Sequence, residues 1–84
     1  MEELEKAIIE RLNYLQKLVK EDSARSYCEI NANEILDALN LAHRGGILAN
    51  ADWWKLTQLV NEFLIDNYLE RIWFSRTLKE LIKD

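Results

Sequence analysis

Proline is absent from the chain, and glycine occurs only as the doublet Gly45-Gly46. Proline removes a backbone donor and glycine loosens the backbone, so both residues normally interrupt helices and mark turns. A chain of 84 residues with so few interruptions is most simply all-α. Its length predicts one domain over residues 1–84.

Cysteine and histidine each occur once, as Cys28 and His43. A single cysteine excludes an internal disulfide, and one residue of each type is too few for a closed zinc site. On one helix these two residues would lie about 22 Å apart, which is too far for a catalytic pair. We expect Cys28 to pack in a helix interface and His43 to be exposed near a helix C-terminus.

Catalytic motifs are missing as well. Gly45-Gly46 has neither the spacing nor the lysine of a phosphate-binding loop. Acidic pairs such as Glu34 and Asp37 fit the water-facing side of a helix, and a glycosidase would also need a sugar-sized cleft. We therefore expect a non-catalytic protein with no cofactor and no metal.

Long apolar runs and a basic N-terminal segment are also absent. Met1 is followed by Glu2-Glu3, so no secretory signal is expected. No apolar run approaches the ~18 residues that span a membrane. These features predict a cytoplasmic protein with a reduced Cys28 thiol and no membrane partner.

Apolar residues recur at helical spacing along most of the chain and predict a compact bundle of three to four helices. The expected ranges are about 3–20, 23–44, 52–66 and 68–83. Gly45-Gly46 ends the second helix. Asn67 and Glu70 have the spacing of a capping box, so a fourth helix begins there unless the last two ranges form one kinked helix.

The stretch 53–74 holds all three tryptophans and both phenylalanines. Trp53 and Trp54 point about 100° apart on a helix, so both cannot lie at the centre of one buried stripe. Aromatic side chains that exceed one core face are enriched at protein interfaces, which favours a homodimer formed through this half. The alternative is a four-helix core that encloses every ring. The predicted self-association residues are Trp54, Phe63, Leu64, Tyr68, Trp73 and Phe74.

Negative charge is concentrated in residues 29–70, which carry seven acidic and two basic residues. Glu62, Asp66 and Glu70 recur every fourth residue, so a helix unbroken at Asn67 would set their carboxylates in a line about 6 Å apart. Phosphates along a nucleic-acid strand have a similar spacing, so such a line can occupy a basic protein groove built for DNA or RNA. The alternative is an ordinary water-facing helix side. The predicted partner-binding acidic strip is Glu34, Asp37, Glu62, Asp66 and Glu70.

In size, acidity, expected helicity and lack of catalytic residues, the chain resembles small proteins of phages and mobile elements, including anti-CRISPR inhibitors. The likeness is one of type, with no shared motif and no site residue to transfer. Through the carboxylates of residues 29–70, the most concrete function we expect is that of a small acidic inhibitor or regulator that binds a nucleic-acid-handling protein.

Two other functions are compatible with the sequence. The first is a dimeric helix-turn-helix regulator, with the glycine doublet in the turn and Lys55, Gln58 and Asn61 on the reading helix. Asp52, Glu62 and Asp66 on the same helix would repel phosphates, so direct nucleic-acid binding is not expected. The second is a purely structural oligomerisation module.

Overall fold

The computed structural model describes residues 2–72, which fold into three α-helices and one short 3-10 helix. Helix α1 spans Glu2–Leu18, η1 spans Asp22–Ala24, α2 spans Arg25–Arg44 and α3 spans Asn50–Asp66. The prediction of an all-α bundle is confirmed, and each α-helix starts and ends within about two residues of its expected range. No helix in this part of the chain is long and apolar enough to span a membrane.

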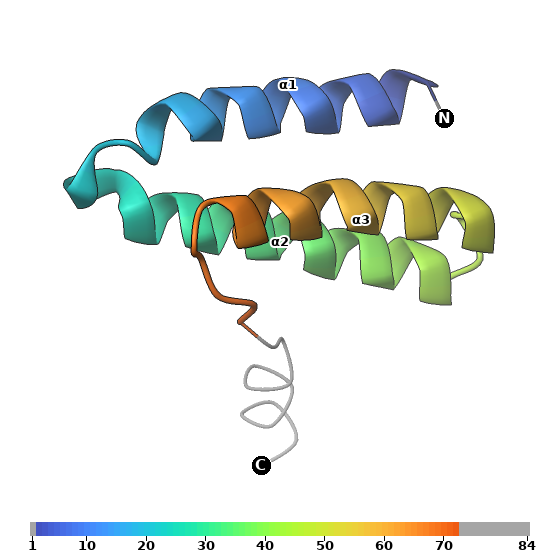
Figure 1. The fold of residues 1–84 in the computed structure, drawn as a ribbon. Helices are drawn as coiled ribbons and strands as arrows, with labels where there is room; N and C mark the ends of the chain where they lie inside the picture. The colour runs from blue at the N-terminus through green and yellow to red at the C-terminus, as the bar shows by residue number, and fades with distance from the viewer. Residues whose placement is uncertain (1, 73–84) are drawn as a thin grey trace, which may run out of the picture.

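The helices lie side by side, with α1 and α3 parallel to each other and α2 antiparallel to both (Figure 1). Two contacts set the register of α1 against α3. Near their starts, the Lys55 ammonium lies 2.8 Å from the Glu5 carboxylate. Near their ends, the amide groups of Gln16 and Asn67 exchange two hydrogen bonds of 3.0 and 2.8 Å. The two parallel helices therefore form one broad face of the molecule.

The core is built from the apolar stripe of each helix, as the spacing predicts. Leu15, Leu56 and Val60 are the large side chains at its centre, and each is fully buried. The small residues Cys28 and Ala32 are also fully buried, where they let α2 approach its neighbours. The core residues are Ile8, Leu12, Leu15, Val19, Cys28, Ala32, Leu36, Leu39, Leu48, Leu56, Val60, Phe63, Leu64 and Leu69.

The two adjacent tryptophans have different environments. The Trp53 ring packs against the core and stacks on the His43 ring, with centroids 4.4 Å apart. Its indole N–H donates a 2.9 Å hydrogen bond to Asn40 Oδ1, so Trp53 joins α3 to α2. The Trp54 ring is exposed. Only one of the pair lies on the buried side, as the angle between neighbouring helical positions requires.

Helix α2 ends at the glycine doublet as expected. Gly46 adopts a left-handed conformation, with φ of +76°. The Ile47 N–H then donates to the Ala42 carbonyl at 2.9 Å, and the Gly46 N–H donates to the His43 carbonyl at 3.2 Å. This is a Schellman motif, which satisfies carbonyls that the helix end would otherwise leave unpaired.

Helix α3 ends in the same motif, but without a glycine. Tyr68 takes the left-handed position with φ of +57°, at a cost of roughly 1–2 kcal/mol for a residue with a Cβ atom. The N–H groups of Leu69 and Tyr68 donate to the carbonyls of Leu64 and Ile65, respectively. Burial of Leu69 in the same cluster as Leu64 offsets part of the strain.

The chain therefore leaves the helical path at Asn67, and α3 does not continue into the following residues. Residues 68–72 are not helical. The rest of the helix expected over 68–83 lies outside the described residues. We call residues 67–72 the crossing segment, because they leave the end of α3 and pass over α2 (Figure 1).

Candidate functional site

The structure separates the five residues of the predicted acidic strip. Glu62 and Asp66 are exposed on α3, one turn apart, and Glu34 is exposed on α2. Asp37 is half-buried and pairs with the Arg71 guanidinium at 3.0 Å. Glu70 lies beyond the end of α3, where its backbone N–H donates a 2.7 Å hydrogen bond to the Glu29 carboxylate. The break at Asn67 thus prevents Glu62, Asp66 and Glu70 from forming one helical line.

Carboxylates of α1 lie beside the N-terminal end of α3. Glu62 and Asp66 follow Lys55 by seven and eleven residues, so they share its side of α3, which faces α1. On α1, Glu2 and Ile9 lie one turn from Glu5 and share its side. This surface therefore carries four carboxylates and one ammonium. We call it the α1–α3 face, and its residues are Glu2, Glu5, Ile9, Lys55, Glu62 and Asp66.

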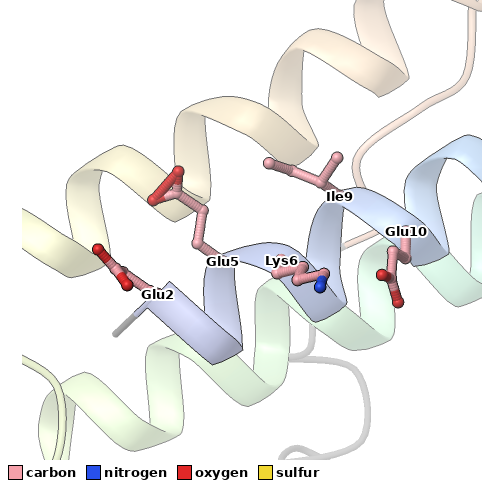
Figure 2. Close-up of a pocket in the computed structure, with 5 residues that line it drawn as sticks. All are labelled: Glu2, Glu5, Lys6, Ile9 and Glu10. Carbon is pink, nitrogen blue, oxygen red and sulfur yellow. The ribbon is translucent and has the colours of Figure 1, made fainter.

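A shallow hollow lies at the N-terminal end of the α1–α3 face (Figure 2). Its volume is about 360 Å³, and its lining residues are Glu2, Glu5, Lys6, Ile9 and Glu10. Glu5 and Ile9 point toward α3, whereas Glu10 points away from it (Figure 2). Three carboxylates and the Lys6 ammonium surround one exposed aliphatic side chain, and this net negative setting suits a basic side chain whose alkyl stem packs on Ile9.

Cys28 and His43, which could in principle act as a nucleophile or as metal ligands, both pack against other side chains of the described residues. Cys28 is fully buried, as expected, and its thiol donates a 3.4 Å hydrogen bond to the Leu15 carbonyl. Burial raises the pKa of this thiol, so it stays protonated and unreactive at neutral pH. His43 is half-buried rather than exposed, because its ring stacks on Trp53 and bonds to Asn50 Oδ1. Among residues 2–72, no three His, Cys, Asp or Glu side chains are grouped to hold a metal.

The predicted self-association residues fall into three groups. Phe63 and Leu64 are buried in the core of this chain, because they continue the core stripe of α3 one turn beyond Val60, so neither presents an exposed side chain to a second copy. Trp54 and Tyr68 are exposed, and Tyr68 reaches 90%. Trp73 and Phe74 lie outside the described residues. Ile65, which the sequence argument did not select, is also exposed and lies eleven residues after Trp54 on the same side of α3.

The side chain of Asn33, which was not predicted as a functional residue, is buried and only 4% exposed. Its Nδ2 group donates to the carbonyls of Glu29 and Glu70 at 2.8 and 2.9 Å. Its Oδ1 atom accepts from the Arg71 guanidinium and from the Ile72 N–H, both at 2.7 Å. Asn33 therefore holds the crossing segment against α2. Asparagine is unfavourable in the middle of a helix. Its presence at position 33 could therefore have indicated that this side chain has a structural role.

The angle between α2 and α3 can be compared with the angle that a helix-turn-helix motif requires. The two helices lie antiparallel and side by side (Figure 1), whereas DNA-reading pairs cross at about 90–120°. Glu62 and Asp66 are also exposed on the helix that would enter the groove. This arrangement does not support direct DNA reading.

No protein-family model, curated protein or solved structure matches the chain.

Proposed function

We propose that this protein is a non-catalytic binding module of the cytoplasm, and that it acts as an acidic inhibitor or regulator of a nucleic-acid-handling protein. Its partner-binding surface is the α1–α3 face, in the manner of small phage and mobile-element inhibitors. The observation that carries the proposal is the pair Glu62 and Asp66. Both are exposed, and within residues 2–72 neither has an ion-pair partner.

The other carboxylates of the predicted strip lie elsewhere. Asp37 is neutralised by Arg71, whereas Glu34 and Glu70 are exposed but lie on α2 and in the crossing segment. Glu62 and Asp66 lie about 6 Å apart along the helix axis, which is close to the interval between successive phosphates. A groove whose lysines and arginines are spaced for phosphates can therefore hold this pair. On α1, Glu2 adds negative charge, whereas Glu5 is paired with Lys55.

Reversing both charges, as Glu62→Lys/Asp66→Lys, is expected to abolish partner binding. The substitutions place two ammonium groups against the basic groove, and like charges across an interface cost several kcal/mol. The tagged wild-type protein would be used to capture the partner from the native host, and the partner would then be identified and purified. Its dissociation constant would be measured by titration calorimetry, with an expected weakening of at least about a hundredfold.

The matched control is Glu3→Lys/Glu21→Lys, which changes the net charge equally. Both residues are exposed, and both lie outside the α1–α3 face. The control is expected to bind within about threefold of wild type, the loss coming only from weaker long-range attraction. Equal weakening by the two double variants would show that net charge, not this face, is recognised. Unchanged binding by Glu62→Lys/Asp66→Lys would contradict the proposal.

A second proposal, a homodimer, rests on the exposed apolar side chains at the outer edge of α3. Trp54, Ile65 and Tyr68 are each more than half exposed, and we call them the α3 edge. Exposed apolar side chains of this size favour burial against a second copy, which presents the same edge across a twofold axis. If the protein were only a structural oligomerisation module, it would need the α3 edge but not the α1–α3 face.

Light scattering is expected to give about twice the chain mass of 10.0 kDa for the wild type. Trp54→Lys/Ile65→Lys places charges at the dimer contact and is expected to reduce the mass to that of one chain. Ile47→Lys, at a more exposed site in the loop after α2, serves as the control and should remain dimeric. A wild-type mass of one chain at micromolar concentration would remove the dimer.

A further inference from the structure

Helices α1 and α2 each carry a second stripe, which lies beside the core stripe. Its residues recur at alternating intervals of three and four, the spacing at which one helix contacts another. All of them except Leu18 and Asn31 are exposed, so the core of this chain does not account for the pattern. We call the two stripes together the α1–α2 seam. Its residues are Leu4, Ala7, Arg11, Tyr14 and Leu18 on α1, and Tyr27, Asn31, Glu34, Ala38 and Leu41 on α2.

The two stripes meet at Arg11, because α1 and α2 are antiparallel neighbours (Figure 1). The Nη2 group of Arg11 donates hydrogen bonds of 3.2 Å to the Tyr27 hydroxyl and 2.6 Å to Asn31 Oδ1. The Arg11 guanidinium also lies 5.4 Å from the centre of the Tyr14 ring. Neutral groups of both helices therefore hold this cation in place, and its Nε and Nη1 groups stay available to a carboxylate from outside the chain.

The seam contains one positive and one negative side chain, and neither has an ion-pair partner in the described part of the chain. Among residues 2–72, Arg11 has no acidic partner and Glu34 has no basic partner. Glu34 lies seven residues after Tyr27 and seven before Leu41, so the three share one side of α2. Such a surface is its own complement, because a twofold axis that passes between Arg11 and Glu34 brings each to the other in a second copy.

We propose that a second copy of this chain packs on the α1–α2 seam across a twofold axis. Two ion pairs form there, each between Arg11 of one copy and Glu34 of the other, and the exposed Tyr14, Tyr27 and Leu41 are buried around them. Charged residues at such positions select the partner and the register. The charges of the seam cancel, so two copies approach here without the repulsion that the carboxylates of the α1–α3 face would cause.

The size of the seam makes this contact a weak one. The seam is about 21 Å long, and two helices of about 10 Å diameter make it about 20 Å wide. Its outline of about 400 Å² is half of the ~800 Å² that each partner contributes to a stable interface. We therefore expect association above about 50 μM, where the seam joins two dimers formed through the α3 edge. The proposal does not depend on the α1–α3 face or on its partner.

Sedimentation equilibrium of the full-length chain tests the proposal in the variant Trp54→Lys/Ile65→Lys, which we call the parent. The parent lacks the α3 edge, so the result does not depend on the dimer proposed above. Its mass is expected to rise from that of one chain, 10.0 kDa, toward that of two chains between about 5 and 500 μM. Added to the parent, Arg11→Glu or Glu34→Arg places like charges across the twofold axis and should weaken association at least about tenfold.

Mixing these two variants in equal amounts is the most specific test. In a mixed pair, each Glu at position 11 or 34 meets an arginine of the other copy, so both ion pairs return with reversed sign. The mixture should associate within about threefold of the parent. Lys6→Glu is the matched control, because it makes the same charge change at an exposed residue about 140° around α1 from Arg11. It should associate like the parent.

Four results would overturn the proposal. The first is a parent that stays one chain at the highest concentration, and the second is association that the seam variants leave unchanged. The third is a mixture that does not associate although both variants are folded by circular dichroism. The fourth is a parent of one chain whose capture of the partner is lost in Arg11→Glu, which would assign the seam to that partner. Leu41→Lys, which leaves the hydrogen bonds of Arg11 in place, decides the matter if Arg11→Glu unfolds.

Discussion

Replacing Leu56 by alanine is expected to lower the free energy of unfolding by about 2–5 kcal/mol. Leu56 is 0% exposed and lies at the centre of the single core cluster that joins the three helices. Removing its branched end loses buried apolar contacts and leaves a cavity that the surrounding helices fill only partly. Domains of this size have a total stability of roughly 4–13 kcal/mol, so this single change removes a large share.

Urea denaturation followed by far-UV circular dichroism measures this loss. Ile47→Ala is the matched control, because it deletes similar atoms from an exposed aliphatic side chain. The control is expected to change stability by no more than about 0.5 kcal/mol. Similar losses for the two variants would contradict the placement of Leu56 at the core centre.

Replacing Asn33 by alanine is expected to lower the free energy of unfolding by about 2–3 kcal/mol. The substitution removes four hydrogen bonds, two of which hold backbone groups of the crossing segment. The Glu70 carbonyl and the Ile72 N–H are left without this partner, so the segment should separate from α2. Hydrogen exchange is expected to show faster exchange at residues 69–72 and unchanged protection in α1 and α3.

Two further variants separate the role of the Asn33 amide from general effects of the substitution. Asn13→Ala changes an exposed asparagine of α1 and should be nearly neutral. Asn33→Asp keeps the acceptor for Arg71 and Ile72 but loses the donor to Glu29 and Glu70, so an intermediate loss is expected. Full protection of residues 69–72 in Asn33→Ala would contradict the role of Asn33 in holding the crossing segment against α2.

The helices could be predicted from the sequence because local rules decide them. Stripes such as Ile8, Leu12 and Leu15 define a buried side, and Gly46 supplies the left-handed residue that ends α2. The end of α3 was left open between two alternatives. It depends on a strained Tyr68, which no propensity favours, and is stabilised by burial of Leu69 in the core.

The candidate site was less predictable than the fold. Spacing alone could place Glu62 and Asp66 on one side of a helix, and the structure has them there. Spacing could not show that Glu70 leaves that line, or that Asp37 is paired by Arg71 34 residues later. Spacing also could not show that Glu2 and Glu5 lie beside α3, because the parallel packing of α1 and α3 is a tertiary property.

Competition between this protein and nucleic acid for the purified partner shows whether Glu62 and Asp66 occupy the partner's nucleic-acid groove. A labelled oligonucleotide bound to the partner would be titrated with the wild type and with Glu62→Lys/Asp66→Lys, and its fluorescence anisotropy followed. The wild type is expected to displace the oligonucleotide, less effectively as salt rises, and the double variant to leave it bound. A ternary complex of partner, oligonucleotide and wild-type protein would show that this protein does not occupy the nucleic-acid groove. Equal displacement by the double variant would show that Glu62 and Asp66 are not the residues that bind there.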